Sequence, residues 1–202
     1  MGLKKILLLG DSIMYGVGQL HGYGYYLQQK LKGKAEVFLP TENCQDITYL
    51  FTFAKELIPR VEEGFDIIHW NNGLWDVLHF AGNDNPYTPI KKYEGNLLKF
   101  YENLRQDYPK SDIFFATTTP IPEHLQKTSS YRRNSEIMEY NSVACKVLAG
   151  KVRAINDLYT AALKMRDDYR HTDGLHYSEE GAQFLSDVVY NFLSDQGVLN
   201  DC

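Results

Sequence analysis

Short runs of apolar residues alternate along the chain with longer stretches in which apolar residues recur every three or four positions. The short runs have the length of strands, and they predict strands at residues 4–9, 36–39, 65–70, 113–117 and 152–155. The longer stretches predict helices at residues 23–31, 48–61, 91–107, 131–148, 157–165 and 179–194. Because strands that alternate with helices form parallel sheets with right-handed crossovers, we expect a three-layer α/β/α sandwich around a five-stranded parallel sheet.

The start of the chain resembles an export signal, because Lys4 and Lys5 precede an apolar run. However, Gly10 and Asp11 end this run after four residues, whereas the apolar part of a signal peptide needs about 7–15 residues. We therefore interpret it as a buried first strand. No other run approaches the roughly 20 apolar residues of a membrane span, so no membrane association is expected.

Length and composition indicate one domain, covering residues 1–202, because the chain can bury one sizeable core but is short for two. The formal net charge of −5 argues against a nucleic-acid partner, since there is no basic excess to neutralise phosphates. The three cysteines are Cys44, Cys145 and Cys202, which are too few and too scattered for a disulfide framework. They predict reduced thiols and a cytoplasmic protein.

Candidate chemistry lies where the predicted strands end, which is the edge at which open α/β sheets bind ligands. Directly after the first strand the sequence reads Gly10-Asp11-Ser12. The glycine permits a tight turn there, so the Ser12 hydroxyl is a candidate nucleophile near backbone N–H groups. The alternative is an ordinary turn or the entry of a helix.

A second motif, Asp173-Gly174-Leu175-His176, stands just before the last helix. A general base needs an acceptor on one imidazole nitrogen while the other nitrogen takes the proton of the nucleophile. Asp173 is close enough in sequence to bend back onto His176 and supply that acceptor. The alternative is a solvated loop in which the aspartate stabilises a turn.

A third motif follows the third strand and contains Asn71, Asn72 and Gly73. A side-chain amide at this place could donate a hydrogen bond to the oxyanion of an acyl-transfer reaction. Asn-Gly is also a strong turn signal, and both interpretations can hold together.

Together these motifs resemble the SGNH or GDSL hydrolase superfamily, which has a flavodoxin-like fold. Gly10-Asp11-Ser12 matches its first block, Asp173-x-x-His176 matches its last block, and the order of strands fits across nearly the whole chain. The resemblance implies a catalytic triad of Ser12, His176 and Asp173. It also implies that no metal or organic cofactor is needed.

The resemblance also implies an oxyanion hole, for which the candidate donors are Ser12, Cys44, Asn71 and Asn72. Cys44 aligns with the glycine of the second block, whose backbone N–H donates to the oxyanion, and a backbone donor survives that replacement. The third block is normally Gly-x-Asn-Asp, but here it reads Gly73-Leu74-Trp75-Asp76. The donor role therefore passes to an asparagine slightly upstream, to Asn71 first and Asn72 second.

Other aromatic and imidazole groups near the predicted site are candidates for its rim, namely Tyr15, Trp75, His79 and His124. Residues 118–122 resemble the proline-rich loop that flanks the cleft in relatives. His21, His69 and His171 lack the spacing of a metal site, so we expect no metal.

The resulting hypothesis is a serine esterase that hydrolyses acetyl or other short-chain acyl esters of small molecules or carbohydrates. A competing hypothesis, motivated by Trp75, is a non-catalytic carbohydrate-binding or regulatory module on the same framework. A second is a flavodoxin-like domain that binds phosphate or flavin, although this leaves the Asp173 and His176 spacing unexplained. Nothing in the pattern indicates the oligomeric state.

Overall fold

All five predicted strands are present in the computed structural model, which describes residues 2–126 and 129–199. They form one parallel sheet in the order β4 (Ala35–Phe38), β1 (Lys4–Leu9), β5 (Ile67–Asn71), β7 (Asp112–Ala116) and β9 (Ala154–Asn156). Neighbouring strands are in parallel register throughout, for example Leu9 beside Trp70 and Trp70 beside Phe115. The predicted fold class is confirmed.

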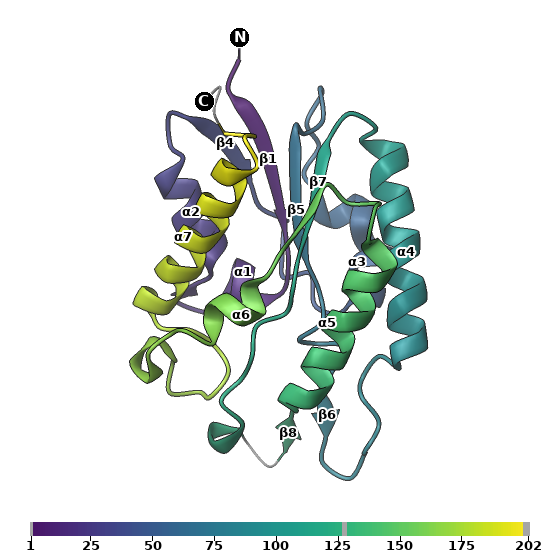
Figure 1. Cartoon of the computed structure of the whole chain (residues 1–202), viewed down its shortest axis with the longest axis vertical. Coiled ribbons are helices and arrows are strands. Elements are labelled where there is room, and N and C mark those ends of the chain that lie inside the picture. Colours follow the sequence, from purple (N-terminus) through teal and green to yellow (C-terminus); the bar gives the residue numbers. More distant parts are fainter. Residues whose placement is uncertain (1, 127–128, 200–202) are drawn as a thin grey trace.

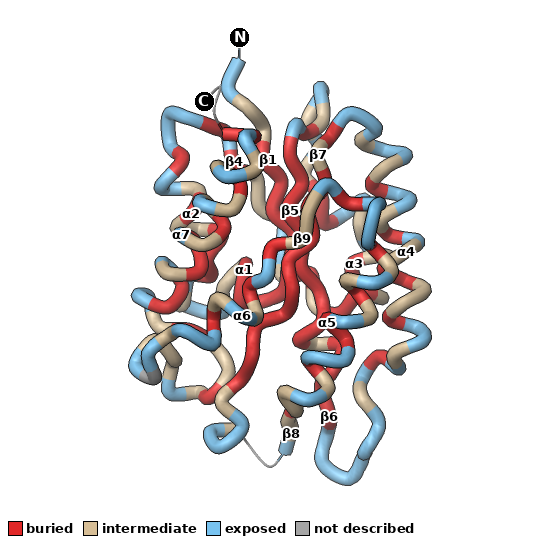
Figure 2. The backbone as a smooth tube through the Cα atoms, in the orientation of Figure 1, coloured by how far each residue is buried: buried red, intermediate tan, exposed pale blue. Residues whose placement is uncertain are grey.

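Helices cover both faces of the sheet (Figure 1). On one face α2 (Tyr23–Lys30) packs against α7 (Glu179–Asp195), which also contacts the short α6 (Leu158–Ala162). On the other face α4 (Ile90–Asp107) packs between α3 (Ile47–Leu57) and α5 (Asn134–Leu148). The central strands are buried from both sides, which explains their unbroken apolar sequence (Figure 2).

Three predicted helices differ from the observed ones by three or more residues at an end, and one of them, predicted at residues 157–165, ends at Ala162. The helix predicted at residues 48–61 ends at Leu57, because Pro59 forces the preceding Ile58 into extended backbone with φ −81° and ψ 120°. The helix predicted at residues 131–148 begins only at Asn134. The residues before it form β8 (Ser130–Tyr131), which pairs antiparallel with β6 (His79–Phe80).

Several short elements were not predicted, because two to four residues are too few to show a periodic pattern. The most important is α1 (Ser12–Tyr15), which directly follows β1. The others are β2 (Gly16–Val17), β3 (Leu20–His21) and two 3₁₀ helices, η1 (Glu123–Leu125) and η2 (Asp167–Tyr169). None of the described helices is long and apolar enough to cross a membrane.

The chain turns back tightly after α1, and glycine makes this possible. A Cβ atom on Gly22 would lie 2.2 Å from the carbonyl oxygen of Met14 and 2.7 Å from the backbone nitrogen of Gly16. These neighbours are backbone atoms and cannot move aside cheaply. Gly22 thus fixes α1, and with it Ser12, against the start of α2.

Gly22→Ala should therefore destabilise the protein by about 1–3 kcal/mol or more, since the added methyl group collides with backbone. Gly95→Ala is the matched control, because Gly95 lies inside α4 and a Cβ there meets no atom within 4 Å. The control should stabilise the protein by about 0.5–1 kcal/mol. Urea unfolding of both variants measures the difference, and equal effects would contradict the role given to Gly22.

Candidate active site

His176 and Asp173 lie in a closed loop of residues 169–178, which we call the histidine loop. Its two arms are joined by backbone bonds, from the His171 N–H to the His176 carbonyl at 2.9 Å and from the Ser178 N–H to the Tyr169 carbonyl at 2.9 Å. Gly174 turns the loop with a φ of 74°, at a place where a Cβ would lie 2.4 Å from the Leu125 carbonyl oxygen. Glycine is needed there for both conformation and space.

Asp173 is bonded on both of its carboxylate oxygens. Oδ1 accepts the backbone N–H groups of Leu175 and His176, each at 2.9 Å, and Oδ2 lies 2.6 Å from Nδ1 of His176. Partial burial alone would raise the pKa of Asp173, but these hydrogen bonds outweigh it and hold the pKa below its ordinary value. The carboxylate is thus ionised and fixes the orientation of the imidazole.

Ser12 stands at the carboxyl end of β1 as the first residue of α1. Asp11 caps this helix, since its Oδ1 accepts the Ile13 N–H at 2.9 Å. The Ser12 Oγ lies 2.9 Å from Nε2 of His176. The structure therefore brings Ser12, His176 and Asp173 into one chain of hydrogen bonds, from hydroxyl to imidazole to carboxylate.

The two asparagines after β5 lie in different surroundings. The β1–β5 register pairs Leu9 with Trp70, so the next residue, Asn71, lies beside Gly10 in the turn that leads to Ser12. Its Nδ2 donates to the Ala116 carbonyl at 2.7 Å, and its second amide hydrogen has no acceptor among the residues that the structure describes. Asn72 is completely buried and bonded on both side-chain atoms, to the Trp70 ring and the Gln45 carbonyl.

Cys44 lies close to the same turn, but its backbone N–H donates to the Gly10 carbonyl at 3.1 Å. A role for Cys44 in an oxyanion hole would require this bond to open, and it stays a prediction. The thiol itself is fully buried, and burial raises its pKa to about 12. Cys44 and Cys145 are both free cysteines.

The four rim candidates occupy varied places. The Tyr15 hydroxyl donates to the Thr41 carbonyl at 3.1 Å, Trp75 is half-buried, and His124 is exposed in η1. His79 is instead completely buried: its ring stacks on Tyr131 with centroids 4.9 Å apart.

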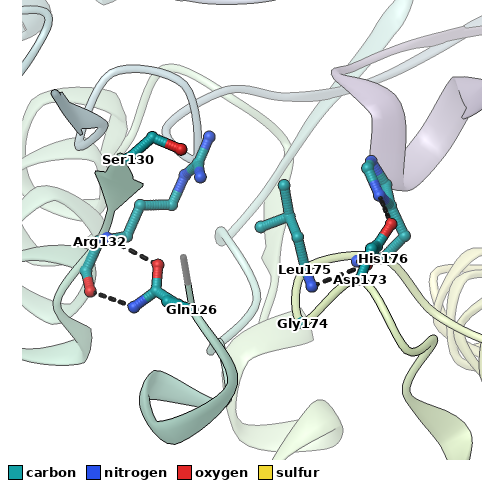
Figure 3. A pocket seen from close by; sticks show the side chains of 7 residues that line it. All are labelled: Gln126, Ser130, Arg132, Asp173, Gly174, Leu175 and His176. Atoms are coloured by element: carbon teal, nitrogen blue, oxygen red, sulfur yellow. Dashed lines mark hydrogen bonds and ion pairs between the residues drawn. The ribbon is translucent and has the colours of Figure 1, made fainter. Parts of the chain in front are cut away.

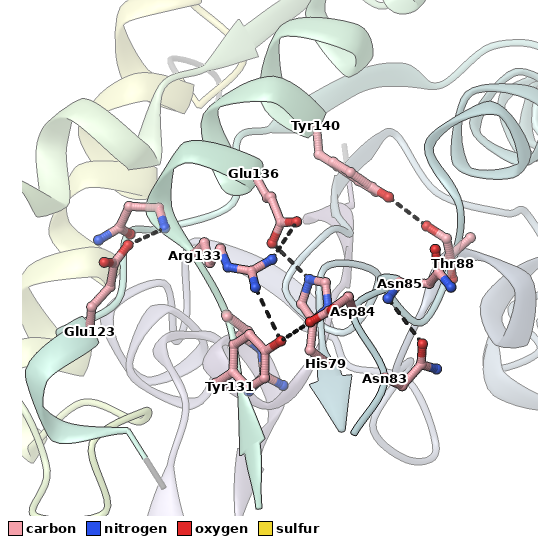
Figure 4. Close-up of polar contacts among 12 residues, drawn as sticks. His79, Asn83, Asp84, Asn85, Thr88, Glu123, Tyr131, Arg133, Glu136 and Tyr140 are labelled. Atoms are coloured by element: carbon pink, nitrogen blue, oxygen red, sulfur yellow. Dashed lines mark hydrogen bonds and ion pairs between the residues drawn. The ribbon is translucent and has the colours of Figure 1, made fainter. Parts of the chain in front are cut away.

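Nε2 of His79 lies 2.8 Å from Glu136, which also binds Arg133 at 3.2 Å (Figure 4). Through these contacts His79 ties β6 and β8 to the start of α5. His176 lines two cavities in the described part of the chain. None of the four rim candidates lines either of them.

Sequence reasoning did not identify three residues that face His176 across a cavity. These are Gln126, Ser130 and Arg132, which form the wall opposite residues 173–176 (Figure 3). Arg132 falls within the helix predicted at residues 131–148, where a basic residue is usually exposed to solvent. The sequence gives no indication that its side chain is buried.

Asp76 couples the loop after β5 to the start of α3. Its two carboxylate oxygens each lie 3.3 Å from the Ile47 backbone nitrogen. Burial, together with the neighbouring carboxylate of Asp46, raises the pKa of Asp76 to about 8. The structure therefore favours the protonated form of this group near neutral pH.

This pKa predicts a pH dependence of stability. An unfolded aspartate ionises near pH 3.9, so between that value and pH 8 unfolding releases a proton from Asp76, and stability falls as the pH rises. The slope should reach about 1.4 kcal/mol per pH unit. Asp76→Asn removes it, whereas Asp84→Asn, a change on an exposed loop, should keep it. Chemical unfolding at pH 5, 6, 7 and 8 measures the slopes, and identical slopes in all three proteins would refute the assignment.

The fold, the hydroxyl–imidazole–carboxylate geometry and the comparisons with known proteins agree on one class: the protein is a carboxylic ester hydrolase. The chain belongs to the GDSL-like Lipase/Acylhydrolase family, whose model matches residues 8–184. The resemblance inferred from the motifs is thereby confirmed.

Individual relatives are distant in sequence. An isoamyl acetate-hydrolyzing esterase 1 homolog from Homo sapiens is 29% identical over 203 residues, which cover 90% of this chain and 77% of that protein. The lipase/acylhydrolase from Enterococcus faecalis has a TM-score of 0.71 at 19% identity, covering 96% of this chain and 97% of that one. The acetyl xylan esterase AlAXEase has a TM-score of 0.72 at 20% identity, covering 94% and 99% of the two chains.

Proposed function

We propose that the protein hydrolyses acetyl and other short-chain acyl esters through an acyl-enzyme on Ser12. The observation that carries this proposal is the chain of hydrogen bonds from Ser12 Oγ to His176 Nε2 at 2.9 Å and from His176 Nδ1 to Asp173 Oδ2 at 2.6 Å. These are the contacts that nucleophile, general base and orienting carboxylate need.

In the first half-reaction His176 takes the Ser12 proton as the Oγ attacks the ester carbonyl. The resulting imidazolium is stabilised by the ionised Asp173. It then gives the proton to the leaving alcohol, which departs and leaves the acyl group on Ser12. In the second half-reaction His176 takes a proton from water, the hydroxide attacks the acyl carbon, and the carboxylic acid is released while Ser12 regains its proton.

The tetrahedral intermediates carry a negative oxygen that needs hydrogen-bond donors. The Ser12 backbone N–H supports this role, because it starts α1 and lacks an intrahelical acceptor. The free amide hydrogen of Asn71 is the second donor, since this side chain lies beside Gly10. Asn72 is less suited, because its side chain is fully buried and already bonded.

A short acyl group is favoured by the space next to Ser12. The cavity lined by Ser12, Gly22, His176 and Tyr177 has a volume of only about 10 Å³, which is space for a group about the size of one water molecule. The cavity on the other side of His176 is larger, about 170 Å³, and is open to a bulkier alcohol. A carbohydrate fits this description, and the fold is shared with an acetyl xylan esterase. The cytoplasmic location expected from the cysteines stays a prediction.

Ser12→Ala should reduce the hydrolysis of nitrophenyl acetate to background, because the nucleophile is lost while the fold keeps its core. In wild type the turnover should fall from acetate to butyrate to octanoate. Release of nitrophenol by both proteins, at equal concentration and with thermal unfolding as the fold control, tests this. Activity retained in Ser12→Ala would remove Ser12 from the mechanism.

Asn71→Ala should lower kcat by about 10²–10³-fold with a smaller change in KM, because the amide acts mainly on the oxyanion of the transition state. Steady-state kinetics with nitrophenyl acetate separates the two parameters. The melting temperature must be recorded as well, because Asn71 also binds the Ala116 carbonyl. An unchanged kcat in a folded variant would assign the oxyanion to other donors.

A further inference from the structure

The cavity between the histidine loop and β8 contains a buried cation that the hydrolytic mechanism does not use. Arg132 lies in its wall, opposite His176 (Figure 3). Only 7% of Arg132 is exposed, which is rare for an arginine unless it is paired. The question is what this guanidinium binds.

Hydrogen bonds to the backbone and to the Nε atom hold Arg132 in place. Its backbone N–H and carbonyl bind the side-chain amide of Gln126 at 2.7 and 2.6 Å, and its Nε donates to the Leu74 carbonyl at 2.6 Å. Within the described part of the chain, neither terminal nitrogen has a hydrogen-bond acceptor. The two N–H donors nearest the cavity are therefore fixed and available.

Among residues 2–126 and 129–199, no carboxylate is hydrogen-bonded to this cation. Burial lowers the pKa of Arg132 to about 10, so the group remains charged at neutral pH, and Asp11 acts on it only through space. Asp11 uses Oδ1 to cap α1, while its Oδ2 has no partner. Asp173, the acid that lines the cavity, is fully occupied by His176 and Leu175.

A guanidinium with two parallel free donors matches a carboxylate, which it can bind through two charge-assisted hydrogen bonds. A neutral sugar hydroxyl would satisfy the donors but would leave the buried charge with only the through-space attraction of Asp11. His176 lines the same cavity and gives its proton to the leaving alcohol in the proposed mechanism. Because the small cavity at Ser12 holds the acyl group in that mechanism, this larger cavity is the place of the alcohol part of the ester.

Resting on the proposed esterase function, we propose that Arg132 binds a carboxylate on the alcohol part of the substrate. The substrates are then short-chain esters of hydroxy acids, among which acidic sugars are the carbohydrate form. The acyl group stays in the small cavity at Ser12, and the carboxylate lies against Arg132 on the far side of His176.

The test compares two acetyl esters that differ in charge, 4-acetoxybenzoate and its neutral amide, 4-acetoxybenzamide. Each kcat/KM is normalised to the spontaneous hydrolysis rate of the same ester. Wild type should prefer the benzoate by about 10–100-fold, the range expected for a charged hydrogen-bonded pair. Arg132→Gln should abolish this preference while it keeps activity on the amide, and Arg132→Lys should retain part of it.

Arg133→Gln is the matched control, because it removes the same charge from the neighbouring residue. The Arg133 side chain binds Glu136 and does not line the cavity. It should leave the preference intact. A binding measurement guards against misfolding of the Arg132 variants: wild type should be inhibited more strongly by 4-hydroxybenzoate than by 4-hydroxybenzamide, and added salt should weaken the difference.

Turnover of both esters by wild type without discrimination, or an equal loss of both in a folded Arg132→Gln, would overturn the assignment of Arg132. If the protein is not an esterase, the same experiments give a different result. In that case wild type hydrolyses neither ester faster than Ser12→Ala, and a serine-directed phosphonate does not label Ser12.

Discussion

The hydrogen bond between Ser12 and His176 joins two residues 164 positions apart, and the site depends on how the fold controls that distance. Both ends are positioned against the same helix. α1, which begins at Ser12, packs on α2, and α7, which begins just after His176, also packs on α2. The end of α1 lies so close to Gly22 that a Cβ atom there would collide with the Met14 carbonyl oxygen. Packing on α2 thus positions both the nucleophile and the base.

Much of the fold could be predicted from the sequence, because each central strand is an apolar run covered on both faces. One kind of failure concerns elements whose form depends on distant partners. Residues 130 and 131 form β8 only because they pair with β6, about 50 residues earlier, so the local helical pattern extended too far. The early end of α3 could have been predicted, since Pro59 restricts Ile58 directly.

The candidate site also contains residues that the sequence reveals and residues that it does not. Ser12, Asp173 and His176 are recognisable because their roles require fixed residue types at fixed spacing next to strand ends. The burial of His79 and of Arg132 cannot be read from the sequence, because burial is a tertiary property. His79 is covered by the stacked ring of Tyr131, and Arg132 reaches the Leu74 carbonyl, 58 residues away. Nothing near either residue in the sequence indicates these partners.

The hydrogen bond that orients His176 on its Nδ1 side comes from Asp173, within the histidine loop. Asp173 accepts from the imidazole and from the backbone N–H groups of Leu175 and His176, so carboxylate and ring form a self-contained unit. A movement of the whole loop would leave the tautomer and tilt of the ring unchanged. It would change the gap between Nε2 and the Ser12 hydroxyl, and the bond from Arg170 in the loop to the Pro120 carbonyl at 2.7 Å resists such a movement. Activity could thus be switched by a rigid displacement of about one ångström, without rebuilding any part of the acid–base pair.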